Sequence, residues 1–381
     1  MRRSTERILT THTGGIGRAK GLTEKIVSAE SNGASDLDAS LRAAVEEIVR
    51  QQIDTGLDIV NDGNQSVTTI ARYAAVHLAG IELAHGVSSN GHRVATPPVN
   101  GDRYQADWDF PEFFARAYPE ADLLDEAAVC TAGVTWEGEA VVRRDLENLL
   151  AASSAAGARE IFASVPSPGT LARAVSNRFY PTRYEFEDAV AGALRTPYSA
   201  IVSAGLLLNV ELAWPGTRSR LLRDVELLNH ALGSIPAESV RVWVSLGADE
   251  GPHHRDPEVL DLVDIVLRID AAGLGLTAAN GRHEADHHVW SDVQLPEGKV
   301  LMPGVIDPTS NIIEHPRTVA DRIIRFSRLV GRENVIASVD SSFEPTPGLY
   351  QEFRVTRDVM WAKLRSLVQG AELATEELWS S

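Results

Sequence analysis

Short runs of apolar residues alternate along the chain with longer segments in which apolar residues recur every three or four positions. The first pattern is typical of buried strands, and the second of amphipathic helices. Strands are predicted at residues 8–12, 57–60, 160–165, 206–210, 240–244, 274–276, 300–306 and 335–339. Eight strands separated by helices predict a (β/α)8 TIM barrel, in which the active site lies at the carboxyl ends of the strands.

The segments between these strands carry signals for helix ends. Helices are predicted at residues 40–55, 182–205, 256–267, 316–331 and 354–369. Thr182 and Glu185 form a capping box at the start of the second of these helices, which Pro197 should kink or split. Asp256 and Pro257 are expected at the N-cap and the first turn of the third helix.

Residues 64–155 interrupt this regular alternation. Residues 88–104 are rich in Gly, Asn, Ser and Pro, which is typical of a loop. Residues 127–135 resemble an additional strand of a hairpin. We interpret residues 64–155 as an insertion after the second strand that covers the mouth of the barrel, within a single domain spanning residues 1–381.

Composition narrows the classes of partner. The 381-residue chain has a net charge of -17 and no block rich in Lys and Arg, which disfavours binding to nucleic acid or to an anionic membrane. Cys130 is the only cysteine, so no intramolecular disulfide is expected. No apolar stretch is long enough for a membrane span or a signal peptide. We expect a cytoplasmic protein that acts on a small molecule, and the apolar barrel helices are compatible with a homodimer.

Polar residues follow the predicted strands. They are His12, Asp62, Asn64, Ser167, Glu211, Ser245, Thr277, Asp307, Asp340 and Ser341. Because the carboxyl ends of barrel strands meet at one edge, we expect these side chains to line one pocket. The alternative is that strand ends are polar only because loops begin there.

Five residues are candidates for acid-base catalysis. Asp62, Glu211 and Asp340 are carboxylic acids at strand ends, and two carboxyl groups that share a dry pocket take different pKa values. His12 and His253 have the ordinary pKa near 6.5 that suits proton transfer. Hydrogen bonding to loop amides is the structural alternative for the carboxylic acids, and a role in structuring its loop is the alternative for His253. Asn64, Ser167 and Asp307 are assigned to substrate binding.

Seven segments, in this order and at these spacings, resemble the catalytic barrel of cobalamin-independent methionine synthase. The match is closest to the short single-barrel relatives that include epoxyalkane:coenzyme M transferases. The segments are TTHTGG at 10–15, NDGN at 61–64, PSPGTLA at 166–172, YPTR at 180–183, EGPH at 250–253, RHE at 282–284 and PGVID at 303–307. The resemblance implies a barrel fold and a reaction in which zinc stabilises an acceptor thiol as the thiolate.

The resemblance also locates the expected zinc ligands. That family has a His-x-Cys pair on strand five, a Glu on strand six and a Cys after strand eight. This chain has Trp243, Ser245, Thr277 and Ser341 at those positions. Indole does not bind zinc and neutral hydroxyls bind it poorly, so we expect no metal here. We assign the four side chains to a substrate pocket, although Trp243 could simply fill the space.

Other positions also carry residues that differ from those of the family. Its serine after the first-strand glycine is Gly15 here, and its glutamate after Asp-Gly is Asn64. Its acidic pair on strand four reads Glu211-Leu212. These differences disfavour homocysteine as the methyl acceptor.

Two further motifs have structural and functional interpretations. His283 to His287 matches HExxH, which in metalloproteases places two histidines on one helix face; a chance match in a solvated loop is favoured. A different metal on His253 and His254, or on His283, His287 and His288, stays open. The turn at residues 167–170 could bind a carboxylate or phosphate at a helix N-terminus.

These observations favour an enzyme of the methionine-synthase-like superfamily that works without zinc. The leading hypothesis is carboxylate and histidine acid-base chemistry on a small, partly apolar organic acid, as a lyase, decarboxylase or non-thiol C1 transferase. The second hypothesis is a methyltransferase with a folate-like donor and a non-thiol acceptor; no other cofactor is expected. The third is a non-catalytic binding or scaffold protein.

Overall fold

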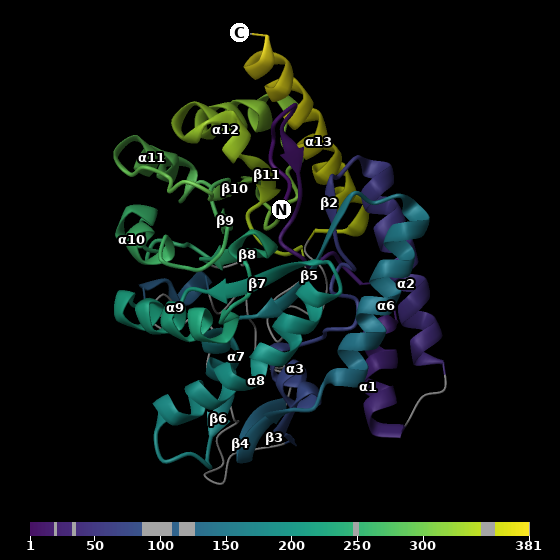
Figure 1. Cartoon of the computed structure of the whole chain (residues 1–381). Helices are drawn as coiled ribbons and strands as arrows, with labels where there is room; N and C mark the ends of the chain where they lie inside the picture. The colour runs from purple at the N-terminus through teal and green to yellow at the C-terminus, as the bar shows by residue number, and fades with distance from the viewer. Residues whose placement is uncertain are drawn as a thin grey trace.

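The computed structural model describes residues 1–18, 21–32, 36–85, 109–113, 126–246, 251–343 and 355–380. Its centre is a sheet of eight parallel strands wound into a nearly closed barrel, with helices between the strands (Figure 1). The strands are β1 (Leu9–Thr10), β2 (Ile59–Val60), β5 (Glu160–Pro166), β7 (Leu207–Ala213), β8 (Val240–Ser245), β9 (Gly273–Leu276), β10 (Val300–Ile306) and β11 (Ile336–Val339). The predicted (β/α)8 barrel and its eight strands are confirmed.

The strands lie in the order β1-β11-β10-β9-β8-β7-β5-β2. Between β1 and β2 the barrel is joined through Asp58, whose backbone N–H donates to the Thr10 carbonyl oxygen at 3.1 Å. The Asp58 carboxylate accepts from the Thr10 N–H at 2.9 Å and also pairs with Arg7. Because all eight strands are parallel, their carboxyl ends and the following loops share one face of the barrel.

Helices surround this barrel and pack in adjacent pairs, among them α2 with α6, α8 with α9 and α12 with α13 (Figure 1). The helices are α1 (Leu22–Asn32), α2 (Leu37–Thr55), α3 (Ile70–His77), α6 (Glu139–Ala156), α7 (Pro168–Arg173), α8 (Arg183–Ser203), α9 (Arg218–Leu232), α10 (Val263–Val266), α11 (Val289–Asp292), α12 (Pro316–Val330) and α13 (Arg357–Trp379). Short 3-10 turns occur at Ala237–Ser239, Val259–Asp261, Glu284–His288 and Arg332–Asn334. No helix in this described part has the length and apolar character needed to cross a membrane.

Two predicted helices differ from the structure in an informative way. Thr182 caps α8 as predicted, accepting a hydrogen bond from the Glu185 N–H, but α8 continues through Pro197 as one helix. Its buried face packs along its whole length, which outweighs the hydrogen bond that proline removes. The helix predicted at residues 256–267 is wrong. Only a 3-10 turn and the four-residue α10 form there, because the Asp256 carboxylate binds two histidines instead of capping a helix.

A second sheet lies outside the barrel and contains three strands, β3 (Leu78–His85), β4 (Glu126–Trp136) and β6 (Val175–Asn177). The strand predicted at residues 127–135 corresponds to β4, which pairs antiparallel with β3. Farther along, α6 packs against α2 in the layer of barrel helices. Residues 86–108 and 114–125 lie outside the described part of the chain, so the cover over the barrel mouth stays a prediction.

The inside of the barrel is partly apolar and partly polar. Buried apolar side chains from seven of its strands form one cluster: Leu9, Ile59, Phe162, Leu207, Trp243, Val300, Met302 and Ile336. Among them lies Arg241, whose side chain is fully buried with its guanidinium 4.2 Å from the centre of the Phe162 ring. A charged group at this depth needs partners, and those partners connect the barrel interior to the strand ends.

Candidate active site

Three polar side chains from three strand regions converge on the backbone of Gly14. A Cβ atom built on Gly14 would lie 2.6 Å from Ser164 Oγ, 3.0 Å from Glu211 Oε1 and 3.3 Å from Asn64 Nδ2. Gly14 also has φ of +144°, a conformation that disfavours other residues. The chain therefore needs glycine at residue 14 to bring the three groups together.

Glu211 is the titratable group at the centre of this arrangement. The side-chain amide of Asn64 donates a hydrogen bond to its carboxyl group. Its Oε1 atom is buried and has no hydrogen-bond partner in the described part of the chain. Burial raises the pKa of Glu211 to about 7, against the smaller lowering effect of Asn64. A carboxyl group with this pKa can both donate and accept a proton near neutral pH.

Asn64 connects Glu211 to a second carboxyl group. Its backbone N–H donates to Asp62 Oδ1 at 3.0 Å, and its φ of +53° is a conformation that asparagine tolerates better than most residues. Burial and, to a smaller extent, the nearby Asp145 carboxylate raise the pKa of Asp62 to about 6. The predicted residues Asp62, Asn64 and Glu211 are thus brought into one group.

Ser164 is held by a buried network that the sequence did not reveal. Arg241 Nε donates to Asn209 Oδ1 at 2.9 Å, which fixes the orientation of the Asn209 amide. Asn209 Nδ2 then donates to Ser164 Oγ and to the Thr13 carbonyl oxygen, both at 3.0 Å. Because Ser164 Oγ accepts from Asn209, its O–H remains the donor toward the site.

His12 lies next to this group, and both of its ring nitrogens form hydrogen bonds. The Gly14 N–H donates to its Nδ1 at 3.3 Å, so its Nε2–H donates to Gln52 Oε1 at 2.8 Å. Burial lowers the pKa of His12 to about 3. The imidazole is therefore neutral, and the geometry favours a role in positioning Gly14 over the predicted role in proton transfer.

Asp340 lies on the other side of the barrel and binds a loop. Its carboxylate accepts from the backbone N–H groups of Ala278, Ala279 and Asn280 at 2.7–3.0 Å. Burial raises the pKa of Asp340 to about 7, while these amides act in the opposite direction. The contacts hold the loop after β9 in place, so they favour a structural role over the predicted catalytic one.

The four positions that the sequence resemblance matches to zinc ligands carry an indole and three hydroxyls. Trp243 is 2% exposed, and its indole N–H donates to the Asp340 carbonyl oxygen at 3.0 Å. The Thr277 hydroxyl donates to the same oxygen at 3.3 Å. Ser245 is half-buried at the end of β8. Ser341, just after β11, has a buried hydroxyl with no hydrogen-bond partner among the described residues, as do Ser338 on β11 and Thr13 after β1.

The histidines at the loops after β8 and β9 form a chain with two aspartates. His253 Nδ1 lies 2.6 Å from Asp256 Oδ2, and His283 Nε2 lies 3.2 Å from the same oxygen. The other ring nitrogen of His283 lies 2.8 Å from Asp286 Oδ2. Burial lowers the pKa of His283, but the two aspartates raise it by more. These contacts between histidines and aspartates join the two loops. The catalytic role of His253 stays a prediction.

This arrangement does not form the metalloprotease motif. Residues Glu284–His288 make a 3-10 turn instead of an α-helix, and His287 Nδ1 donates to the Glu284 carbonyl oxygen. His254 lies apart, with Nε2 2.7 Å from Asp109 Oδ2. In the parts of the chain that the structure describes, no group of three or more His, Cys, Asp or Glu side chains is placed to hold a metal ion.

The side chains of Ser167 and Asp307 form hydrogen bonds with nearby groups in their own loops. Ser167 is fully buried and caps α7, its Oγ accepting from the Thr170 N–H at 3.3 Å. Asp307 Oδ1 accepts from the N–H and the hydroxyl of Thr309 at 2.9 and 2.7 Å. These contacts show that both side chains help to hold their loops, and their predicted role in substrate binding stays a prediction.

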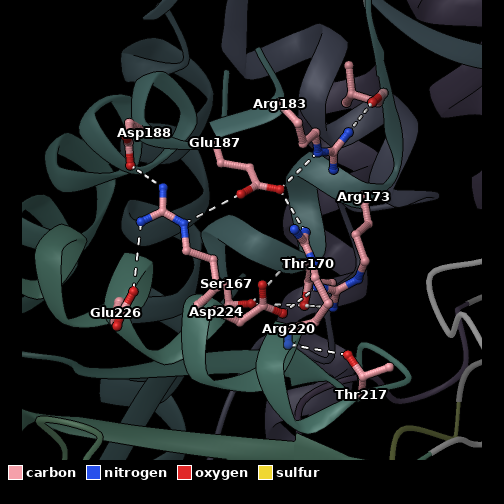
Figure 2. A network of polar contacts seen from close by, with 12 residues as sticks. Ser167, Thr170, Arg173, Arg183, Glu187, Asp188, Thr217, Arg220, Asp224 and Glu226 are labelled. Atoms are coloured by element: carbon pink, nitrogen blue, oxygen red, sulfur yellow. Dashed lines mark hydrogen bonds and ion pairs between the residues drawn. The ribbon is translucent and has the colours of Figure 1, made fainter. Parts of the chain in front are cut away.

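An ion-pair network supports the strand end that carries Glu211 (Figure 2). Asp224 on α9 is fully buried and pairs with Arg173, which also donates to the Ala213 carbonyl oxygen at 2.7 Å. Gly169 lies so close to the Asp224 carboxylate that a side chain at residue 169 would clash with it. The protein's own carboxylate thus occupies the turn at residues 167–170, where an anionic ligand was considered.

Comparisons with known proteins agree with this architecture. No family model matches the sequence, and no curated protein does. A B12-independent methionine synthase from Shewanella sp. W3-18-1 superposes with a TM-score of 0.71 at 16% sequence identity, covering 98% of this chain and 100% of that one. A structural genomics target from Listeria monocytogenes, assigned as a vitamin-B12-independent methionine synthase, gives 0.63 at 16%, covering 96% and 98%. At this identity the similarity shows the fold alone.

Proposed function

We propose that this chain is an enzyme that uses Glu211 as a general acid and base on a small, partly apolar organic acid. The observation that carries the proposal is the Glu211 carboxyl group itself, near the carboxyl end of β7, with a pKa of about 7 and one oxygen that has no hydrogen-bond partner among the described residues. General acid-base catalysis by a group of matched pKa contributes roughly 10²- to 10⁴-fold in rate.

Each residue around Glu211 has a distinct part in this proposal. Asn64 orients the carboxyl group, and Ser164 offers a hydroxyl donor beside it. The unpartnered hydroxyls of Thr13 and Ser341 could donate to the substrate carboxylate. Asp62 is a second acid, with a pKa of about 6, that can exchange protons at the same edge of the barrel.

The reaction class that fits best is proton transfer to or from carbon. In a lyase reaction, the Glu211 carboxylate takes a proton from carbon as a leaving group departs. In a decarboxylation, protonated Glu211 supplies the proton that replaces carbon dioxide. Neither step requires a thiolate, and the indole and hydroxyls at residues 243, 245, 277 and 341 are poor partners for zinc.

A second candidate function is methyl transfer from a folate-like donor to a non-thiol acceptor. It is favoured by the assignment of both structural neighbours as methionine synthases that do not use B12. In this case Glu211 would remove the proton from an amine or enol acceptor. The third hypothesis, a binding or scaffold protein without turnover, predicts that substitutions at Glu211 leave its function unchanged.

The test follows hydrogen exchange at carbon in D2O, by NMR, with a panel of small organic acids. Wild-type protein should exchange a carbon-bound proton of its substrate, and Glu211→Gln should reduce the rate at least 100-fold. Glu297→Gln, an exposed change on a surface turn, is the matched control and should retain the rate. Turnover that survives both Glu211→Gln and Asp62→Asn would overturn the proposal. Saturable binding of a methyl-folate, lost in Glu211→Gln, would favour the second candidate.

A further inference from the structure

A cleft on the side of the barrel shares Tyr73 with a small chamber whose wall includes Asp62, Asn64 and Ser164 of the group around Glu211. It is bounded by helices α1, α2, α3 and α6, and its volume is about 330 Å³, which is adequate for a small ligand. Apolar side chains form much of its wall: Ile26, Leu37, Leu41, Val67, Val76 and Val141. We propose that this cleft binds a compact, uncharged and mostly apolar molecule that carries one hydrogen-bonding oxygen.

Tyr73 supplies the hydrogen-bonding group. Its side chain is 7% exposed, and it lines both the cleft and a smaller chamber of about 50 Å³ deeper in the protein. Its hydroxyl is buried and has no hydrogen-bond partner in the described part of the structure. An unpaired buried hydroxyl is unfavourable, so a ligand that displaces the side chains covering it and pairs an oxygen with it gains binding free energy.

The position of this hydroxyl is fixed before any ligand binds. The Tyr73 ring stacks on the His77 ring with their centres 4.1 Å apart, and His77 stacks on Trp136 at 5.4 Å. The His77 Nδ1–H also donates to the Tyr73 carbonyl oxygen at 2.8 Å. A preorganised donor loses little conformational freedom on binding, so the hydrogen bond should add to affinity.

The charges beside the cleft argue for an uncharged ligand. Arg144 lies at its edge, and its guanidinium pairs with Asp145 at 2.8 Å and with Asp38 at 3.3 Å. This cation is thus matched by two carboxylates, and Arg72, the second cation among the lining residues, is buried and already has an interaction partner. An anionic ligand would have to compete with both for Arg144, and a cationic ligand would have to compete with Arg144 for them.

The alternative is that water satisfies Tyr73. The inner chamber is large enough for a water molecule, and Asp62, Asp145 and Ser164 supply polar atoms in its wall. In that case the hydroxyl would have no unmet hydrogen bond to offer a ligand, and an oxygen atom on the ligand would add nothing to its affinity. The ratio between the affinity of a ligand that carries the oxygen and that of a ligand that lacks it distinguishes the two cases.

The experiment uses the full chain and three probes with the same ring system: 2-naphthol, naphthalene and 2-naphthoate. Binding of 2-naphthol is followed by its fluorescence, which is excited at wavelengths longer than those that tryptophan absorbs. The other two probes are titrated as competitors. We expect one 2-naphthol per chain, an affinity for naphthalene about fivefold lower because one hydrogen bond is missing, and weaker competition by the charged 2-naphthoate.

Variants locate the probe and test the role of Tyr73. Tyr73→Phe should bring the 2-naphthol and naphthalene affinities close together while leaving naphthalene binding intact. Val76→Trp should fill the cleft and abolish binding. Leu150→Trp on α6 is the matched control, because Leu150 and Val76 are 38% and 39% exposed and Leu150 does not line the cleft.

Four results would each overturn the proposal. They are no saturable binding of 2-naphthol by the wild type, full binding by Val76→Trp, an affinity ratio that Tyr73→Phe leaves unchanged, and loss of binding in Glu211→Gln. The last result would place the probe at the barrel mouth. Glu211 lines neither the cleft nor the chamber, and probe binding is measured without turnover, so either proposal can fail without the other.

Discussion

The indole N–H of Trp243 donates a 3.0 Å hydrogen bond to the carbonyl oxygen of Asp340, across the inside of the barrel from β8 to the end of β11. Gly275 on β9 makes room for this indole, since any side chain at residue 275 would overlap its ring. The large residue on one strand and the small residue on the next therefore depend on each other, and the pair fills the space in which the resemblance would place a metal.

This dependence predicts a coupled effect on stability. Trp243→Ala should lower the free energy of unfolding by about 3–5 kcal/mol, because it leaves a large cavity in the barrel. Gly275→Ala should be destabilising in the wild type, where it clashes with the indole, but close to neutral in the Trp243→Ala background. Urea unfolding of the two single variants and the double variant measures the coupling. Additive effects would contradict the proposed packing.

The position of the barrel and of Glu211 could be predicted because both follow from local patterns. Each strand is a short apolar run, and Asp62, Asn64 and Glu211 come directly after such runs. Ser164 and Asn209 lie inside strands and were missed. A signal for them existed, since they alternate in phase with the inward-facing Phe162 and Leu207, and a polar residue at such a position needs a buried partner.

Other features could not be predicted because the interacting residues are far apart in the sequence. Arg241 is the buried partner in that network, but nothing near it in sequence shows that its three donor groups reach Asn209, Thr11 and His12. Asp256 looked like a helix cap because it precedes a proline. The structure instead pairs it with His283, 27 residues away. Local rules for capping cannot detect competition from a partner in a different loop.

Glu211 should make the stability of the protein depend on pH. Its pKa is about 7 when folded and 4.5 ordinarily, so the folded state binds the proton more tightly and stability falls as pH rises from about 4.5 to 7. Because the Glu211 residue is only half-buried, the loss should be smaller than the ~3 kcal/mol that this shift would give for a fully buried group. Glu211→Gln should remove this dependence and be more stable than the wild type at pH 8.

The measurement is urea unfolding of both proteins between pH 4 and pH 8. Asp62→Asn serves as a comparison, because the pKa of Asp62 is about 6 and its effect should be complete at lower pH. Parallel curves for the wild type and Glu211→Gln would show that the carboxyl group titrates as in solution, and the acid-base role proposed for it would lose its basis.

His283 should also make the stability of the protein depend on pH, but through a positively charged form instead of a carboxylate. Both of its ring nitrogens face carboxylates, which favour the imidazolium form and raise the pKa above the ordinary 6.5, although burial acts in the opposite direction. Its stabilising contribution is therefore present below that value and is lost as pH rises through the folded pKa. We expect His283→Gln to cost roughly 3 kcal/mol at pH 6 and less at pH 9.

His254→Gln is the control for this prediction, because His254 is exposed and pairs with a single aspartate. Its effect should remain within about 1 kcal/mol at either pH. A cost for His283→Gln that does not change between pH 6 and pH 9 would mean that the imidazole is neutral in the folded protein.

The ion-pair network behind β7 distinguishes buried charges from exposed ones (Figure 2). Glu187 is fully buried and pairs with Arg220 at 2.7 Å and with Arg183 at 2.9 Å, whereas Glu226 is 59% exposed and lies 3.9 Å from Arg223. Removing Glu187 leaves arginines without a buried counter-charge. Glu187→Ala should therefore cost about 3–5 kcal/mol, and Glu226→Ala less than about 1 kcal/mol.

Salt separates these two effects further. Exposed pairs are screened at 1 M ionic strength while buried pairs are much less so, so the cost of Glu187→Ala in urea unfolding should persist in 1 M NaCl and that of Glu226→Ala should vanish. Equal costs for the two variants would show that burial does not strengthen the network. Since the adjoining Arg173 binds the Ala213 carbonyl oxygen two residues beyond Glu211, loss of the network should also shift the pH at which Glu211 titrates.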